Sequence, residues 1–159
     1  MANKRLTKKR YPLAKDVETI DGIMKASYEV VSGDAGKKRQ WQRDISLHSP
    51  NAIYAFSVQE EGKDKEVIMH IEDFQKETDF MVMKTGFFEN EIYREVRVFG
   101  NMAHVWSTYE TRLQNNGPVV RTGINSVQLY KQDNRWWIFS WIFDKEKGDT
   151  KIPQTFKPQ

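Results

Sequence analysis

The sequence predicts a single α+β domain in which three N-terminal helices pack on one face of a strongly curved antiparallel β-sheet. Two patterns support this fold class: apolar residues recur at helical spacing in the first half of the chain, and the second half alternates with period two. A length of 159 residues suits one domain and is short for two. The domain is expected over residues 15–145, between a basic flexible tail over 1–14 and a polar C-terminal tail over 146–159.

The first half predicts helices over about 17–31, 37–47 and 71–84. In each, apolar residues return every three or four positions and form one face for packing. Asp16 precedes the first helix as its N-cap. Pro50 ends the second, because the residue before a proline avoids helical geometry.

The second half predicts long strands joined by turns. A short strand over 52–58 comes first, and the long strands are expected over 87–99, 102–113, 119–132 and 135–144. Gly100-Asn101 and Asp133-Asn134 are typical two-residue hairpin turns. These turns predict a register with Arg94 opposite Ser107, Ile92 opposite Tyr109, Val127 opposite Ser140 and Asn125 opposite Ile142. A slip of one residue would move every side chain beyond it to the other face.

The face away from the helices is predicted to be aromatic. Its members are Trp106, Tyr130, Trp137, Phe139, Trp141 and Phe143. A strand that is apolar on both sides is buried on both sides, and the helices cover only one. We therefore expect a homodimer packed through the sheet. The alternative is that the C-terminal tail folds back over this face.

Charge and composition restrict the partners. Five of the first ten residues are basic, and without them the chain has 20 basic and 22 acidic residues, so it offers no basic footprint for nucleic acid. No segment approaches the roughly 20 apolar residues of a membrane span. The chain has no cysteine, and its three histidines lack metal-ligand spacing. We expect no metal, cofactor, nucleic acid or membrane partner and a cytoplasmic location, with a leader removed before residue 1 as the alternative.

Four sequence motifs carry a family resemblance. They are Leu47-x-x-Pro50-x-Ala52, Gly100-Asn101-x-Ala103 with the following residues 105–110, the segment 123–129, and Asp133-x-x-Trp136-x-Ile138. Together they resemble the nuclear transport factor 2-like superfamily, which has the cystatin-like cone fold, in a small bacterial-type branch with SnoaL-like and ketosteroid-isomerase-like relatives. The resemblance implies a pocket between the helices and the sheet, and frequent dimerisation. The superfamily includes isomerases, dehydratases, polyketide cyclases and ligand binders, so the fold alone does not settle the function.

A pocket on the inner face would be mostly apolar, with a few polar side chains. The strands would contribute Arg94, Ser107, Tyr109, Asn125 and Ser140, with Arg121 nearer the rim, and the helices would contribute Tyr28 and Trp41. Arg94 matters most, because an inward guanidinium needs a carboxylate or an anionic ligand. The alternative is a structural pair with an acid such as Asp44 or Asp144.

Three functions remain open from the sequence. The favoured hypothesis is a non-catalytic binder of a small, partly apolar molecule, neutral or anionic, through Arg94, Tyr109 and Asn125. The first alternative is an isomerase, dehydratase or polyketide-cyclase-like enzyme, with Tyr109 as electrophile and Asp44 or His48 as base. Its weakness is that the predicted inward strand positions hold no Asp, Glu or His. The second alternative is a protein-interaction module that uses the aromatic sheet face.

Overall fold

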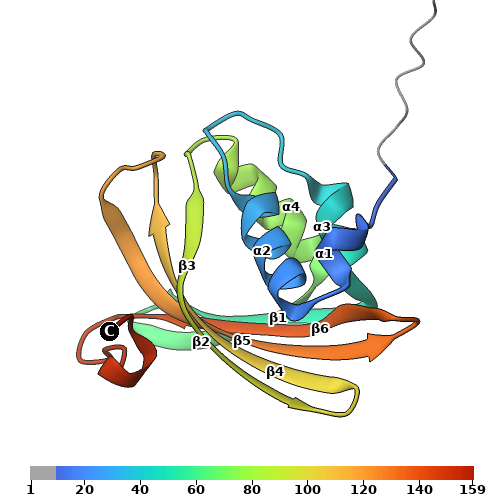
Figure 1. The fold of residues 1–159 in the computed structure, drawn as a ribbon. Coiled ribbons are helices and arrows are strands. Elements are labelled where there is room, and N and C mark those ends of the chain that lie inside the picture. Colours follow the sequence, from blue (N-terminus) through green and yellow to red (C-terminus); the bar gives the residue numbers. More distant parts are fainter. Residues whose placement is uncertain (1–9) are drawn as a thin grey trace, which may run out of the picture.

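The computed structural model describes residues 10–159 and places a layer of helices on one face of a curved sheet (Figure 1). Most of the predicted basic tail, residues 1–9, lies outside the described residues. The elements, in chain order, are α1 (Ala14–Val17), α2 (Ile20–Val31), α3 (Trp41–Leu47), β1 (His48–Glu60), β2 (Lys63–His70), α4 (Ile71–Val82), β3 (Phe88–Phe99), β4 (Met102–Arg112), β5 (Val119–Gln132), β6 (Arg135–Lys145) and the 3-10 helix η1 (Gln154–Phe156). The α+β class and the four long strands are confirmed.

The six strands form one sheet in the order β2-β1-β6-β5-β4-β3. All neighbours are antiparallel except β1 and β6, which run parallel, so the sheet is mostly rather than wholly antiparallel. Figure 1 shows β3 and the adjoining ends of β4 and β5 curving up beside the helices. Strand β2 was not predicted, because it is a largely charged and exposed strand at the sheet edge without apolar alternation.

The core lies between the helices and the inner face of the sheet. Ile23 and Met24 from α2 and Leu47 from α3 are fully buried there, against Val105 and Val127 of the central strands. Helical and alternating spacing assigned these positions to the inside, except Leu47, in whose helix Trp41 and Ile45 were expected to face inward. The core therefore fixes the distance between the two layers, and with it the space that remains at the other end of the cone.

The predicted first helix is divided into α1 and α2, which corrects the role of Asp16. Thr19 begins α2, and its hydroxyl accepts a hydrogen bond from the backbone nitrogen of Gly22 at 2.9 Å. Asp16 lies within α1 and is buried. Its carboxylate is used for tertiary contact rather than for capping.

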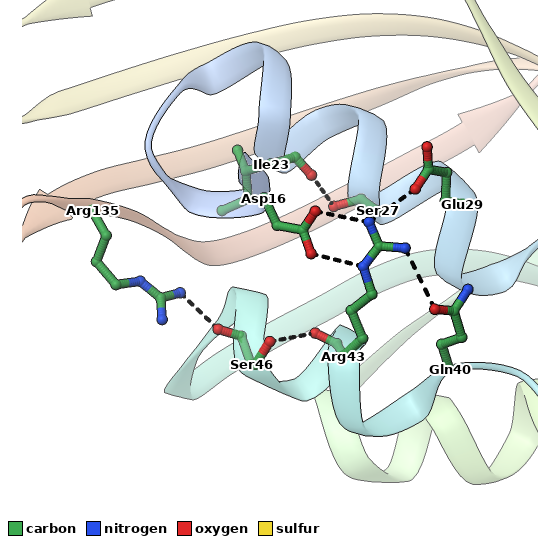
Figure 2. A network of polar contacts seen from close by, with 8 residues as sticks. All are labelled: Asp16, Ile23, Ser27, Glu29, Gln40, Arg43, Ser46 and Arg135. Carbon is green, nitrogen blue, oxygen red and sulfur yellow. Dashed lines mark hydrogen bonds and ion pairs between the residues drawn. The ribbon is translucent and has the colours of Figure 1, made fainter. Parts of the chain in front are cut away.

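A buried ion pair joins the three N-terminal helices (Figure 2). The Arg43 guanidinium on α3 donates from Nε to Asp16 Oδ2 at 2.7 Å and from Nη2 to Asp16 Oδ1 at 2.8 Å. Nη2 also donates to Glu29 of α2 at 2.9 Å. The Arg43 and Asp16 side chains are only 6% and 3% exposed. This two-point contact sets the positions of α1 and α3 relative to one another.

The C-terminal segment packs on the outer face of the sheet, so the expectation of a loose tail is wrong for it. Ile152 is buried, and the Thr108 hydroxyl of β4 donates to the main-chain oxygen of Phe156 at 2.7 Å. The Phe156 ring lies 5.6 Å from the ring of Trp106 and 6.4 Å from that of Tyr93, measured between centroids. The tail thus covers part of the aromatic face that the sequence assigned to a dimer.

Candidate functional site

A β-bulge in β3 brings acidic side chains to the inner face. The predicted register is confirmed from the hairpin turn as far as Arg94 opposite Ser107. Beyond that point the register shifts by one residue, and Glu91 rather than Ile92 lies opposite Tyr109. Because side chains alternate across a strand, the shift turns Glu91 and Glu89 toward the helices. The prediction that the inward strand positions hold no acid is therefore wrong.

A second bulge, at Phe139 in β6, corrects the other hairpin. Beyond Leu129 opposite Ile138, the strand places Trp141 opposite Val127 and Phe143 opposite Asn125. The prediction that Trp141 and Phe143 lie on the outer face is wrong, since both contribute to the inside. Ser140 pairs instead with the outward Gln128, so it does not line the inner face as predicted. Ile142, which was expected to face inward, is exposed.

A cavity of about 320 Å³ lies between α2, α4 and the inner face of the sheet. This volume falls in the range of about 300 to 1,000 Å³ that is typical of small-molecule sites. Its deep wall is aromatic: Tyr54 stacks on Phe74 at 4.3 Å and on Trp141 at 6.0 Å between ring centroids. Phe56 and Phe143 continue this wall as a second stacked pair. An apolar ligand would therefore replace water along most of this wall.

Glu89 is an acid of the inner face that lines the cavity. Burial raises its pKa to about 7, against the opposing effects of a hydrogen bond from Asn125 and the charge of Arg121. The Asn125 amide donates to Glu89 Oε1 over a long 3.4 Å. Register places Glu89, Thr111 and Arg121 side by side on β3, β4 and β5. The Glu89 carboxyl can therefore be present as an acid or as a base near neutral pH.

A series of hydrogen-bonded side chains behind Glu89 contains four of the site residues predicted from the sequence. Asn125 Nδ2 donates to the Tyr28 hydroxyl at 3.0 Å, and Tyr28 and Ser107 share a hydrogen bond at 2.6 Å. The Ser107 hydroxyl donates to Glu91, whose other oxygen accepts from Arg94 Nε at 2.9 Å. Arg94 also pairs with Asp21. Of these residues, only Asn125 lines the cavity.

Arg94 therefore has a structural partner, as the sequence allowed, but the acids are Glu91 and Asp21 rather than Asp44 or Asp144. The bulge supplies this partner, because without it Glu91 would face outward. Two carboxylates already neutralise this guanidinium and accept its hydrogen bonds, so it is poorly suited to bind an anionic ligand.

The other predicted acid and base lie at the deep end of the cavity. Asp44 is buried and accepts a hydrogen bond from Gln75 Nε2 at 2.6 Å, and burial raises its pKa against the opposing effects of His48 and Gln75. His48 lies within 2.7 Å of the main-chain oxygen of Asp44 through Nδ1 and within 2.8 Å of the Tyr54 hydroxyl through Nε2. Both ring nitrogens are thus occupied, and Tyr54 stands between His48 and the cavity. Asp44 lines the cavity, whereas His48 does not.

No protein-family model matches the chain, and no curated protein matches it either. Several solved structures match the chain in fold. A Mycobacterium tuberculosis protein of unknown function is 13% identical, with a TM-score of 0.60 over 82% of this chain and 71% of its own. An NTF2-like protein of unknown function from Shewanella baltica is 12% identical, with a TM-score of 0.55 over 81% of this chain and 92% of its own. A Streptomyces avermitilis protein, provisionally named as a dehydratase of the NTF2-like family, is 17% identical, with a TM-score of 0.58 over 84% of this chain and 97% of its own.

The chain has the NTF2-like fold. The resemblance noted in the sequence is confirmed at the level of the fold, and the curved sheet with its helical layer is the cone that this fold forms. At such low identities the comparisons show the fold alone, so the site rests on the geometry of this chain.

Tyr109 crosses the floor of the NTF2-like cone beside Glu89. Its ring passes over Gly123, where an added Cβ would lie 2.4 Å from the phenol oxygen, so the ring requires a glycine at this position. Burial, with a smaller contribution from the Glu89 charge, raises the pKa of Tyr109, which keeps the phenol protonated. Within residues 10–159 the hydroxyl makes no hydrogen bond. Trp41, by contrast, lies outside the cavity lining and donates from its indole to Asp79 at 2.8 Å.

The outer face of the cone keeps four of the six predicted aromatic residues. Tyr130 and Trp137 stack at 6.3 Å, Trp106 packs under Phe156, and Phe139 is 47% exposed. The predicted dimer through this face stays a prediction. No helix among the described residues is long and apolar enough to cross a membrane.

Proposed function

We propose that this chain binds a small, largely apolar molecule in the cone cavity, with Glu89 and Tyr109 as its polar contacts. The observation that carries this proposal is a cavity of about 320 Å³ with an aromatic wall, beside which the inner face of the sheet places Glu89 and Tyr109. The Tyr109 hydroxyl offers a hydrogen bond that no described residue accepts. The Glu89 carboxyl offers a donor or an acceptor according to pH. Arg94, the contact favoured from the sequence, is replaced in this role.

A linear alcohol is a suitable first probe. We expect 1-octanol to bind with a dissociation constant on the order of 0.1 mM, because its chain leaves water for the aromatic wall. Thr78 of α4 lines the cavity, so Thr78→Phe should fill part of it and weaken binding at least about tenfold, the equivalent of about 1.4 kcal/mol. Isothermal titration calorimetry measures both values.

The matched control adds an aromatic ring on the same helix but away from the cavity. Lys76 is exposed, and Lys76→Tyr should leave octanol binding unchanged. Equal octanol affinity in wild type and in a folded Thr78→Phe variant would place any binding elsewhere and contradict the proposal.

A second candidate function is catalysis, and the placement of Glu89 favours it. A carboxylate of raised pKa next to a neutral phenol is suited to moving a proton beside a carbonyl group. Glu89 would take the proton from the carbon between a ketone and a double bond, while Tyr109 donates a hydrogen bond to the carbonyl oxygen. Glu89 would then return the proton to the far carbon, so the double bond moves into conjugation and no proton is gained or lost.

The test for catalysis uses a small β,γ-unsaturated ketone and follows conjugation by ultraviolet absorbance. The rate should rise with pH through about 7 as Glu89 loses its proton. Glu89→Gln should lower it by about 10²–10⁴-fold. Glu66→Gln, at an exposed position on β2, is the control. A rate that survives Glu89→Gln would exclude Glu89 as the base, and no rate at all would leave binding as the function.

A further inference from the structure

The opening of the cavity is marked by residues that both line it and are exposed. They are Val58, Glu77, Met81, Arg121, Asp144 and Lys145. These residues come from the ends of β1, β5 and β6 and from one side of α4. The opening is therefore charged, whereas the wall behind it is aromatic.

Arg121 differs from six other arginines of the described residues. Each of these six donates a hydrogen bond to an acceptor in the protein: Arg39, Arg43, Arg94, Arg97, Arg112 and Arg135. Among residues 10–159, the Arg121 side chain has no hydrogen bond and no ion pair within 4.0 Å. Its neighbour on the inner face, Thr111, is 2% exposed, and its buried hydroxyl also lacks a partner. Thr111 does not line the cavity, so of these two groups only the exposed Arg121 guanidinium is open to a ligand or to water at the opening.

Lys145, which has no ion pair with any residue of 10–159, adds a second cation at the opening. It lies opposite Gly123, which is two residues from Arg121 on the same strand and the same face. Of the acids nearby, Asp144 is already paired with Lys147 at 3.4 Å and accepts from its neighbour's backbone nitrogen at 2.8 Å. Glu77 is exposed on the α4 side of the opening. Glu89, the acid beside Arg121, has a pKa of about 7 and is mainly protonated below that pH, so the β5–β6 side of the opening is the side that attracts an anion there.

We propose that Arg121, assisted by Lys145, binds the anionic end group of an amphipathic ligand whose apolar body lies against the aromatic wall. This inference rests on the proposed function, because it needs the cavity to be a binding site. It names the ligand class as a small carboxylate, sulfonate or phosphate with an apolar tail. It also assigns recognition of the charge to the rim of the cone, not to Arg94, which is paired with Glu91 and Asp21.

Three probes with the same apolar chain separate the proposal that the cavity binds an apolar molecule from the proposal that Arg121 binds its anionic end. Octanoate, 1-octanol and octylammonium are titrated into the protein by calorimetry at about pH 6, where the Glu89 carboxyl is mainly protonated. Octanoate should bind about tenfold more tightly than octylammonium. Arg121→Gln should weaken octanoate about fivefold and leave octanol unchanged. Because Arg121 is exposed, added salt should reduce the preference for octanoate.

Arg97→Gln is the matched control, since Arg97 is a strongly exposed arginine on the outer face. It should change none of the three affinities. Octanol binding with no preference for octanoate, or a preference unchanged in Arg121→Gln, would overturn the role of Arg121 while leaving the cavity as a binding site. If none of the three probes binds, both the cavity proposal and this inference fail.

Discussion

Replacing Asp16 with alanine is expected to lower the free energy of unfolding by about 3–5 kcal/mol. The reason is the Arg43 guanidinium, which is 6% exposed and donates both of its shortest hydrogen bonds to this one carboxylate. Without Asp16, a buried cation would keep only the Glu29 carboxylate at 2.9 Å and a long hydrogen bond to the neutral Gln40 side chain at 3.5 Å. The loss should appear as a lower midpoint in urea denaturation with an unchanged slope.

The control removes the other carboxylate of the same network. Glu29 is 39% exposed, so water can replace it, and Glu29→Gln should cost no more than about 1 kcal/mol. Equal losses in Asp16→Ala and Glu29→Gln would show that the buried pair does not hold α1 and α3 together.

Replacing Glu89 with glutamine is expected to stabilise the fold at about pH 8 by about 2–3 kcal/mol and to change little at about pH 4. Burial raises the pKa of Glu89 from 4.5 to about 7, so the folded state holds the proton more tightly than the unfolded state does. The wild type therefore loses stability as the pH rises from about 4.5 to about 7, and this loss persists at higher pH. Glutamine carries no charge, so the Glu89→Gln variant does not lose stability in this way as the pH rises.

The measurement is a set of urea titrations across this pH range for wild type, Glu89→Gln and Glu66→Gln. Glu66 is exposed, so its variant should follow the wild type at every pH. A Glu89→Gln curve parallel to the wild type would mean that the Glu89 carboxyl is well solvated, and the cavity would lose its acid–base group.

Most of the fold could be predicted because its signals are local. Helical spacing gave α2 and α4, and the turn residues at Gly100 and Asp133 gave both long hairpins. The misses have physical causes. Thr19, a better-placed cap, divides the first helix, and β2 is a charged edge strand whose partner is needed to order it.

The site could not be predicted in the same way, because two bulges decide it. Strict alternation placed Glu89 and Glu91 outside, and the extra residue near Ile92 reverses them. In β6, apolar residues on both sides of the strand conceal the extra residue at Phe139, so Trp141 and Phe143 were assigned to the wrong face. A bulge depends on how two strands pair, and no residue type in either strand predicts its position.

The most direct test of the cavity as a binding site is an NMR titration with 1-octanol that follows the five tryptophan indole N–H signals. Only Trp141 lines the cavity, whereas Trp106 and Trp137 lie on the outer face of the sheet. Binding in the cavity should give a saturable shift of the Trp141 signal while the Trp106 and Trp137 signals stay in place. A Trp141 signal that does not move, or shifts confined to the outer tryptophans, would contradict it.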